Sequence, residues 1–388
     1  MSEWTTIRLG SVVRTNTTSY SPKEGWKYVN YLDTGNITEN VIDAIHHIDL
    51  ENEKLPSRAK RKVQMNSILY STVRPNQKHF GIIKSMPENF LVSTGFVVID
   101  VIPEKADADY LYFWLTQNTV VEQLHAIAEQ SVSAYPSIKA SDIENLEIAL
   151  PPLTVQKSIA SILKSISDKM SHNSNINENL EHQSLALFRN YYEQSNTEID
   201  FTDLIQVLGG GTPKTRESTY WNGNIPFFTP KDVGFPYTLA TEKTITEDGL
   251  LHCNSRLYPV NTVFVTARGT VGKVGIAGVP MAMNQSCYAL IGKGIHQLLV
   301  YFYTLKAIDR LKHKASGAVF DAIITKDFET EQVFKLSPND TDTFIRIVEP
   351  MYQSILNNSI EKQRLIALRD SLLPKLMSGE IDVSKLDI

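Results

Sequence analysis

Two short loops carry the side chains in this chain best suited to chemistry. Arg74-Pro-Asn-Gln-Lys-His79 follows a stretch of β-branched and aromatic residues that predicts a strand, and Arg268-Gly-Thr-Val-Gly-Lys273 follows a similar stretch about 195 residues later. Guanidinium and ammonium groups contact phosphates, and Arg, Asn, Gln and Lys also donate hydrogen bonds to base edges in a DNA groove. Both loops are therefore candidate DNA contacts.

Other basic and polar residues extend this candidate surface. A basic run from Lys54 to Lys62 supplies phosphate contacts on one interpretation and a solvated face on the other. Gly209-Gly-Gly-Thr-Pro213 predicts an exposed turn, beyond which Tyr220 and Trp221 could meet DNA or lie in the core. The predicted DNA contacts are Arg58, Lys60, Arg61, Arg74, Asn76, Gln77, Lys78, His79 and Tyr135 in the first half, and Lys214, Arg216, Lys231, Arg268, Thr270, Lys273, Lys312 and Ser316 in the second.

Sequence motifs for catalysis, metal binding and nucleotide binding are missing. Gly272-Lys273 is followed by Val274, where a phosphate-binding loop needs Ser or Thr. No GxSxG, HExxH or CxxC pattern occurs, and the Pro151-Pro152 pair lacks the flanking Asn or Asp and aromatic residue of an amino-methyltransferase motif. We therefore expect no catalytic residue, metal ligand or cofactor, although acidic residues scattered in sequence can still assemble in space.

Composition limits the class of protein. With 388 residues, of which 42% are hydrophobic, the chain can bury more than one core. The net charge of -5 gives no global basic excess, so any nucleic-acid surface must be local. Only two cysteines occur, there is no signal-peptide pattern, and no apolar run reaches the roughly 18 residues of a membrane span. These features predict a soluble, cytoplasmic protein with two buried, reduced thiols and no membrane contact.

Two long helices are the elements that must position the candidate loops. From Gln156 to Tyr192, apolar residues recur every seven residues, which is the pattern of a coiled-coil seam. A shift of 185 residues reaches a second seam in the same phase, and an Asn interrupts both seams at the same slot. The seam residues are Ile159, Ile166, Asn173, Leu180 and Leu187 in the first helix, and Phe344, Met351, Asn358, Leu365 and Leu372 in the second.

The repeat extends beyond the helices. The strands at 66–74 and 261–268, the Gly-containing strands that follow them, and the pair Asp142 and Asp327 recur at similar offsets. The predicted fold is α+β, with two similar α/β domains separated by two long helices that form an antiparallel coiled coil, in an internal pseudo-two-fold repeat. The predicted division is residues 1–150, a spacer helix at 151–195, residues 196–338, and a C-terminal spacer helix and tail at 339–388.

Four segments carry a more specific signal. They are Leu150-Pro-Pro-Leu-Thr-Val-Gln-Lys-Ser-Ile-Ala-Ser-Ile-Leu163, Asn175-Ile-Asn-Glu-Asn-Leu180, the Gly209–Pro213 stretch with Tyr220-Trp221 and Ile225-Pro226, and the ending Leu372-Leu-Pro-Lys-Leu-Met-Ser-Gly-Glu-Ile381. With these segments, essentially the whole chain resembles the specificity subunit of type I restriction-modification systems. One departure is that Ser337-Pro338-Asn339 replaces the Pro-Pro-Leu of the first half.

The resemblance implies a function as well as a fold. Residues 1–150 and 196–338 would be target recognition domains, each reading one half of a split double-stranded DNA sequence. The subunit itself would be non-catalytic. It would recruit two adenine-N6 methyltransferase subunits, which bind S-adenosylmethionine, and through them two restriction-translocase subunits with endonuclease activity. Two alternatives remain, namely a stand-alone coiled-coil DNA-binding or architectural protein and a divergent DNA-modifying enzyme.

The spacer can also be considered physically. A helix from about Val155 to Tyr192 is roughly 57 Å long and needs a partner for its apolar stripe. Antiparallel pairing with a helix at about 341–376 puts Asn173 and Asn358 near the shared midpoint, where we expect them to lie together and fix the register. The alternative is that each Asn faces solvent or a bound subunit. Lys362 and Arg369 weaken the second seam and could face a partner subunit.

Overall fold

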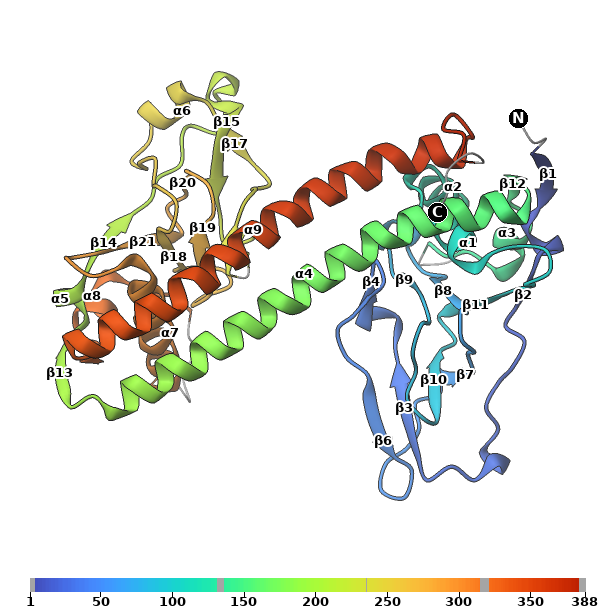
Figure 1. Cartoon of the computed structure of the whole chain (residues 1–388), viewed down its shortest axis with the longest axis horizontal. Helices are drawn as coiled ribbons and strands as arrows, with labels where there is room; N and C mark the ends of the chain where they lie inside the picture. The colour runs from blue at the N-terminus through green and yellow to red at the C-terminus, as the bar shows by residue number, and fades with distance from the viewer. Residues whose placement is uncertain (1–3, 131–135, 235, 315–320, 384–388) are drawn as a thin grey trace. The chain divides into compact units, whose positions relative to one another are not determined.

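The computed structural model describes residues 4–130, 136–234, 236–314 and 321–383, which fold into two compact units (Figure 1). Unit 1 consists of Met1–Lys169 and Leu365–Ile388, and unit 2 of Met170–Arg364. The helices α4 (Leu153–Gln194) and α9 (Pro338–Met377) contribute residues to both units and extend slightly beyond the helices estimated from the seam, at about 155–192 and 341–376. Each unit therefore combines one set of strands with parts of both long helices.

Unit 1 is built from short strands in two sheets and an antiparallel pair. The pair joins β1 (Thr5–Arg8) to β12 (Glu147–Leu150). The first sheet has the order β2-β11-β8-β9 and the second the order β6-β3-β10-β7. The bounds are β2 Val13–Thr15, β3 Tyr28–Leu32, β6 His46–Asp49, β7 Ala59–Arg61, β8 Ile68–Ser71, β9 Phe80–Ile82, β10 Phe90–Ser93 and β11 Phe96–Val101, with hairpin β4 Ile37–Thr38 and β5 Val41–Ile42, and helices α1 Ala108–Leu115, α2 Asn118–Glu129 and α3 Ala140–Glu144.

Unit 2 repeats this arrangement. An antiparallel pair joins β13 (Thr197–Asp200) to β22 (Gln332–Lys335), one sheet has the order β14-β21-β18-β19-β16, and the other the order β17-β15-β20. The bounds are β14 Ile205–Gly209, β15 Trp221–Phe228, β16 Tyr237–Thr238, β17 Thr244–Ile245, β18 Val263–Thr266, β19 Val274–Ala277, β20 Ala282–Met283 and β21 Cys287–Gly292, with helices α5 Phe201–Leu204, α6 Glu247–Leu251, α7 Gln297–Lys314 and α8 Thr325–Glu329.

The repeat is visible in individual hydrogen bonds. Asn66 and Asn261, which precede β8 and β18, both adopt a left-handed backbone, with φ of 69° and 71°. Asn tolerates this conformation better than other residues with a side chain. The backbone N–H of Asn66 donates a 2.8 Å bond to the carbonyl of Ile83, just beyond the end of β9. The N–H of Asn261 donates a 2.8 Å bond to the carbonyl of Ala277, at the end of β19. Asp142 and Asp327, at the start of α3 and α8, likewise each accept a bond from the backbone three residues earlier.

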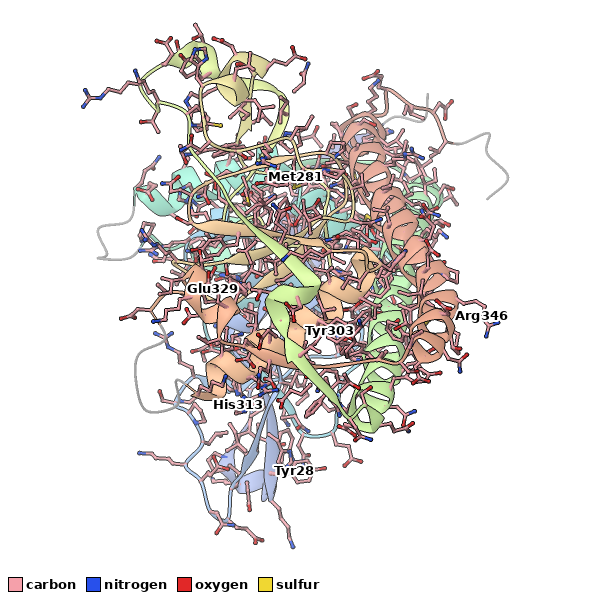
Figure 2. The ribbon with its side chains drawn as sticks, turned by 90° about the vertical axis from the view of Figure 1, so that its left-hand side faces the viewer. Tyr28, Met281, Tyr303, His313, Glu329 and Arg346 are labelled. Carbon is pink, nitrogen blue, oxygen red and sulfur yellow. The ribbon has the colours of Figure 1, made fainter. Side chains whose placement is uncertain are left out.

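The core of unit 2 lies around α7, which packs between the larger sheet and the long helices (Figure 1). Phe302 stacks on Phe188 of α4, with ring centroids 5.2 Å apart, and meets Phe344 of α9 edge-on at 5.0 Å. Tyr303, also on α7, lies in this core, whereas Arg346 extends outward from α9 (Figure 2). Aromatic packing on α7 therefore fixes the sheet against the two helices.

The two long helices run antiparallel within unit 2. Ser184 contacts Met351 and Asn177 contacts Asn358, so residue numbers rise along one helix as they fall along the other. In unit 1, Ile159 and Leu163 of α4 and Leu376 of α9 belong to one core. Further along the pair, the buried residues of α4 include the predicted seam residue Asn173 as well as Glu181, Ser184, Phe188 and Tyr192. The predicted seam residues Leu180 and Leu187 are only half-buried.

The predicted pairing of Asn173 with Asn358 is wrong. Asn173 donates a 2.7 Å bond to Glu361, and Asn358 donates a 2.9 Å bond to Asn177. Both Asn side chains therefore bond across the helix pair, but to partners about one turn away from the expected ones. The prediction aligned the helices by their midpoints, whereas in the structure Phe188 of α4 and Phe344 of α9 both pack on Phe302 of α7 in a register about one turn away.

Two further expectations need correction. Lys362 donates a 2.9 Å bond to Ser174 of α4, so it faces its sister helix and not a partner subunit. Arg369 pairs with Asp370 of its own helix, and its expected role toward a partner subunit stays a prediction. Cys287 is buried, but Cys253 is only half-buried. No helix in the described part of the chain is both long and apolar enough to cross a membrane.

Candidate nucleic-acid interface

The first candidate loop is a tight 3-10 turn between β8 and β9. Pro75–Gln77 forms the turn, and Arg74 and Lys78 on either side both have a left-handed backbone. Lys78 donates a 2.8 Å bond to Glu39, and His79 Nδ1 lies 2.7 Å from the Ile37 carbonyl oxygen. Lys78 and His79 are thus held by the β4–β5 hairpin, while Arg74, Asn76 and Gln77 are at least partly exposed.

Three segments of unit 1 meet beside this loop. The Thr72 N–H donates a 2.8 Å bond to the Gly95 carbonyl, and the Thr94 N–H donates a 2.8 Å bond to the Arg58 carbonyl. Gly95 lies close to the loop after β3, because a Cβ atom at this position would lie 2.9 Å from the Thr34 methyl group. The turn between β10 and β11 therefore contacts the strand leading to Arg74, the residue Arg58 before β7 and the loop after β3. We call this meeting point the junction of unit 1.

Unit 2 builds the same junction from equivalent segments. The Ala267 N–H, one residue before Arg268, donates a 2.7 Å bond to the Ser286 carbonyl in the turn between β20 and β21. The Thr270 hydroxyl donates a 3.3 Å bond to the Pro230 carbonyl in the loop after β15. A third link occurs in both units. The Ile138 N–H donates to the Thr72 carbonyl in unit 1, and the Ile323 N–H donates to the Ala267 carbonyl in unit 2.

The side chains at the two junctions differ although the backbones correspond. Leu32 pairs with Val92 in unit 1, and Phe228 pairs with Met283 in unit 2, so the strands are in the same register. The residues that follow these pairs are Asp33 and Ser93 in unit 1, and Thr229 and Asn284 in unit 2. One scaffold thus presents two different sets of hydrogen-bonding groups.

The basic run at 54–62 divides between two environments. Arg58 and Lys60 are exposed, whereas Arg61 is half-buried, and burial lowers the pKa of its guanidinium. Lys62 forms an ion pair with Glu24 and lies 5.0 Å from the centre of the Trp26 ring. The Arg58 carbonyl belongs to the junction described above, whereas Lys60 and Arg61 lie beyond it along β7.

The glycine-rich stretch is packed rather than exposed as predicted. A Cβ atom at Gly210 would lie 2.1 Å from the Asn284 carbonyl oxygen, so this segment runs directly against the junction of unit 2. Thr212 bonds to Gln285 in the same turn. Lys214 and Arg216 beyond it are exposed, and the Lys214 carbonyl accepts a 3.2 Å bond from the half-buried Trp221 ring. The glycines therefore bring the basic segment close to the candidate interface.

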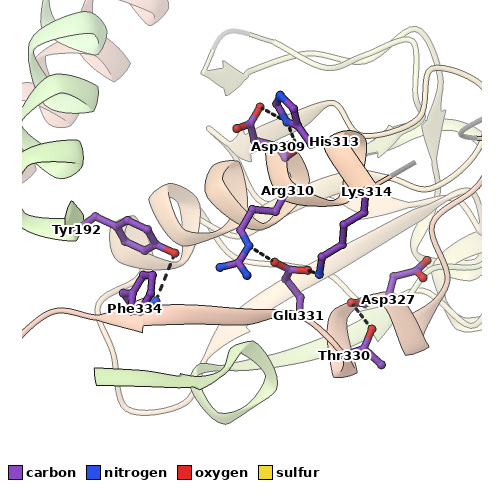
Figure 3. Close-up of polar contacts among 9 residues, drawn as sticks. All are labelled: Tyr192, Asp309, Arg310, His313, Lys314, Asp327, Thr330, Glu331 and Phe334. Atoms are coloured by element: carbon purple, nitrogen blue, oxygen red, sulfur yellow. Dashed lines mark hydrogen bonds and ion pairs between the residues drawn. The ribbon is translucent and has the colours of Figure 1, made fainter. Parts of the chain in front are cut away.

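The remaining predicted contacts of unit 2 lie in different places. Arg268 and Lys273 are exposed on the loop after β18, and exposed Lys231, in the loop after β15, lies 3.7 Å from Glu242. Lys312 lies on the last turn of α7 and is exposed, while its neighbours Arg310 and Lys314 turn toward buried Glu331 (Figure 3). Tyr135 and Ser316 lie outside the described residues.

The sequence prediction missed a polar pocket in unit 1. The pocket has a volume of about 490 Å³ and is lined by the end of β3, by β6 and by the loop before β7. Its polar lining residues are Tyr31, Asp33, His46, His47, Glu53, Lys54, Ser57 and Arg58. The only feature of the sequence that falls in this pocket and stands out is the adjacent pair His46-His47, which is exposed on β6. Among the described residues, no group of three or more His, Cys, Asp or Glu side chains could hold a metal ion.

Comparison with known proteins gives these units a family. The family model described as "Type I restriction modification DNA specificity domain" matches residues 1–182 and again residues 195–368. The HindI type I restriction enzyme specificity subunit of Haemophilus influenzae is 23% identical, with 98% of this chain and 100% of the relative covered. The EcoR124I/EcoR124II specificity subunit of Escherichia coli is 30% identical over 44% of this chain and 46% of its own length.

A solved structure agrees on the fold. The S subunit of a type I restriction-modification system from M. genitalium superposes with a TM-score of 0.63 at 15% identity, covering 97% of this chain and 96% of the other. At that identity, the likeness bears on the fold alone. The family model matches the chain twice and covers most of it. The two matches correspond to the two units with repeated strands and hydrogen bonds. The chain therefore belongs to the type I restriction-modification DNA specificity family and is a specificity subunit with two recognition domains.

Proposed function

We propose that this subunit reads a split double-stranded DNA sequence, with unit 1 reading one half-site and unit 2 the other, and that it has no catalytic role of its own. The observation that carries the proposal is the duplicated junction, in which equivalent backbone bonds hold different side chains. A constant frame with variable polar groups is what reading two different half-sites requires.

Within each unit, the proposed contacts fall into two classes. Exposed Lys and Arg outside the junction loops, such as Lys60 and Lys214, bind phosphates and set orientation without reading sequence. Residues on the junction loops, such as Arg74 and Arg268, reach base edges. Two methyltransferase subunits, which supply S-adenosylmethionine and the adenine-N6 methylation chemistry, assemble on this subunit, and restriction subunits join through them.

The relatives support the assembly part of this proposal by their names. Each curated relative described above is a type I restriction enzyme specificity subunit, which is a component of a larger enzyme. The alternative of a divergent DNA-modifying enzyme requires that the isolated chain bind S-adenosylmethionine. The alternative of a stand-alone architectural protein requires tight DNA binding without other subunits.

The decisive experiment is to sequence DNA methylation in a host with and without this chain, while its methyltransferase subunit remains present. The expected result is a split motif with methylated adenine that disappears when the chain is deleted and returns on complementation. A methylation pattern that does not depend on the chain would overturn the proposal. Calorimetric titration of the isolated chain with S-adenosylmethionine distinguishes the enzyme alternative, since only that alternative requires binding.

A further inference from the structure

The polar pocket lined by Asp33 and Arg58, which sequence reasoning missed, lies at the junction of unit 1. Tyr31 and Asp33 come from the end of β3, His46 and His47 from the neighbouring strand β6, and Arg58 from the loop before β7. The Arg58 carbonyl accepts the Thr94 N–H, which ties this wall of the pocket to the turn beside Thr72 and Arg74. The pocket is therefore connected through the junction to the Arg74 loop, which is proposed to contact DNA.

Asp33 is kept as an acceptor in this pocket. Burial acts to raise the pKa of its carboxyl, but hydrogen bonds from the Thr34 N–H, Ser93 and Tyr31 and the charge of Arg58 outweigh it, so the pKa is lowered. The Thr34 N–H donates at 2.8 Å to Oδ1, and each carboxylate oxygen can accept more than one bond. A fixed carboxylate repels a phosphate but accepts hydrogen bonds from an amino group.

Arg58 supplies the complementary donors. Its side chain is exposed, and in the described part of the chain its guanidinium forms no ion pair. Since no carboxylate among the described residues holds this guanidinium in a bidentate pair, its planar fork can donate two parallel hydrogen bonds to an external partner. The pocket is thus lined by both a donor fork and an acceptor.

His47 adds a second oriented group. The Asn30 amide nitrogen donates a 2.7 Å bond to the Glu88 carbonyl, so its oxygen faces His47 Nδ1 at 3.2 Å. That oxygen can only accept, so Nδ1 carries the proton and Nε2 is an acceptor in the neutral ring. The Tyr28 ring lies 5.1 Å from the His47 ring, and its hydroxyl donates to Glu88. Asp33 and His47 are therefore oriented before any ligand arrives.

We infer that this pocket reads one G·C base pair of the first half-site from the major groove, with Arg58 donating to guanine O6 and N7 and Asp33 accepting from the cytosine N4 amino group. The inference rests on the proposed function and adds a base identity to it. A G·C pair presents two acceptors next to one donor, which matches a guanidinium beside a carboxylate. An A·T pair presents only one acceptor on the purine, followed by a donor, and leaves the guanidinium fork half used.

Unit 2 supports assigning this specificity to the first half-site alone. Thr229 and Asn284 stand where unit 1 has Asp33 and Ser93. Thr229 is already engaged, since its hydroxyl donates a 2.6 Å bond to Asp232. The second half-site therefore serves as an internal control for any substitution in the pocket.

The test uses the assembled complex with its methyltransferase and compares Arg58→Ala, Asp33→Asn and the matched control Lys60→Ala. Asp33→Asn keeps an oxygen for the Thr34 N–H, and Lys60 is an exposed cation in β7, two residues beyond Arg58. Methylation sequencing measures the base preference at each position of the motif. We expect both pocket variants to lose preference at the same G·C position by roughly 5- to 150-fold, with the second half-site unchanged. Lys60→Ala should weaken all sites evenly.

A direct binding measurement covers variants that methylate too poorly to sequence. Duplexes that carry each of the four base pairs at each position of the first half-site are titrated with the wild-type and variant complexes. Wild-type selectivity for G·C at one position, lost in both variants, supports the inference. Unchanged selectivity, an even loss of affinity over all duplexes, or loss at an A·T position would overturn it. If the wild-type chain directs no split motif at all, the proposed function fails instead.

Discussion

Asn358 donates a 2.9 Å hydrogen bond from α9 to the side-chain oxygen of Asn177 on α4. The Asn177 amide nitrogen in turn lies 3.2 Å from the Ser359 hydroxyl and 3.3 Å from the Ile355 carbonyl. This small network joins the two helices of unit 2 at one register, because sliding by a turn would remove every bond in it.

The first prediction concerns this network. Asn358→Leu should lower the free energy of unfolding by about 1 kcal/mol, since the Asn177 oxygen loses its donor. The double variant Asn177→Leu/Asn358→Leu should lose less than the sum of the two single variants, because neither helix then presents an unpaired amide. Chemical denaturation of the four proteins forms the mutant cycle, with exposed Asn175→Leu as the control. Strict additivity would show that the two residues do not interact.

The second prediction follows from a buried carboxyl group. Glu181 of α4 accepts a 2.8 Å bond from the Tyr301 hydroxyl of α7 and a second from the Tyr352 hydroxyl of α9. Burial raises the pKa of Glu181, although both tyrosine bonds and nearby His182 act to lower it. The folded state then holds a proton that the unfolded state releases, so this group's contribution to stability falls as the pH rises from the unfolded pKa to the folded one and is constant above it.

Two substitutions separate the charge of Glu181 from its hydrogen bonds. Glu181→Gln should remove this pH dependence and keep an acceptor for a tyrosine hydroxyl. Glu181→Leu should cost about 1–3 kcal/mol for each hydroxyl left unpaired at all pH values. Thermal unfolding between about pH 4 and pH 9 measures both effects, with exposed Glu178→Gln as the control. A Glu181→Gln protein with the wild-type pH profile would contradict the assignment.

Sequence reasoning succeeded where the signal was periodic or repeated. The seven-residue pattern predicted α4 and α9 to within a few residues, and the offset between Asn66 and Asn261 correctly located equivalent strands in the two halves. Each of these features depends on local backbone preference and on the spacing of apolar residues, both of which are written in the sequence.

Sequence reasoning failed where the outcome depends on contacts between residues that are distant in sequence. The predicted seam does not include Glu181 and Ser184, but α7 and α9 bury both residues and supply partners such as Tyr301 and Met351. The alignment of Asn173 with Glu361 depends on how both helices pack against α7, and a shift of one turn leaves the apolar pattern almost unchanged. The Asp33 pocket joins three segments that are separated in sequence, so no linear motif announces it.

The third prediction concerns Glu331, which is fully buried between two cations. Lys314 Nζ lies 2.5 Å from one carboxyl oxygen, and Arg310 Nε lies 2.8 Å from the other (Figure 3). Both cations are partly exposed and can regain water, whereas the carboxylate cannot. The double variant Arg310→Met/Lys314→Met should therefore destabilise the protein by about 3–5 kcal/mol, because it leaves a buried charge unpaired.

Glu331→Gln provides the contrast, and it should cost less than the double variant because no buried charge remains. Lys312→Met, on the same turn of α7 but exposed, serves as the control and should unfold as the wild type does. Denaturant titration gives the order of the four proteins. Equal losses for Glu331→Gln and the double variant would mean that the carboxylate keeps water access after its partners are removed.

The fourth prediction tests the separate reading of two half-sites. Arg74→Ala should reduce discrimination in the first half-site only, and Arg268→Ala in the second only, each by about 1–3 kcal/mol at the affected base pair. The physical reason is that the two loops belong to different units with equivalent but separate junctions. Methylation sequencing of both variants gives the base preference at every position. If one variant altered both halves of the motif, or neither variant altered any, the assignment of these loops would be wrong.

The fifth prediction treats the helix pair as a ruler for the spacing of the half-sites. Inserting seven residues adds about 10 Å to a helix, which corresponds to roughly three base pairs of DNA. Matched seven-residue insertions in α4 and α9 preserve the seam, so the complex should methylate motifs whose spacer is longer while both half-sites stay the same. Matched four-residue insertions also lengthen both helices but break the seven-residue repeat, and they should weaken methylation at every spacing. Methylation sequencing reads half-sites and spacer together. An active seven-residue variant that kept the original spacer would refute the ruler, because the separation of the half-sites would then be set by something other than helix length.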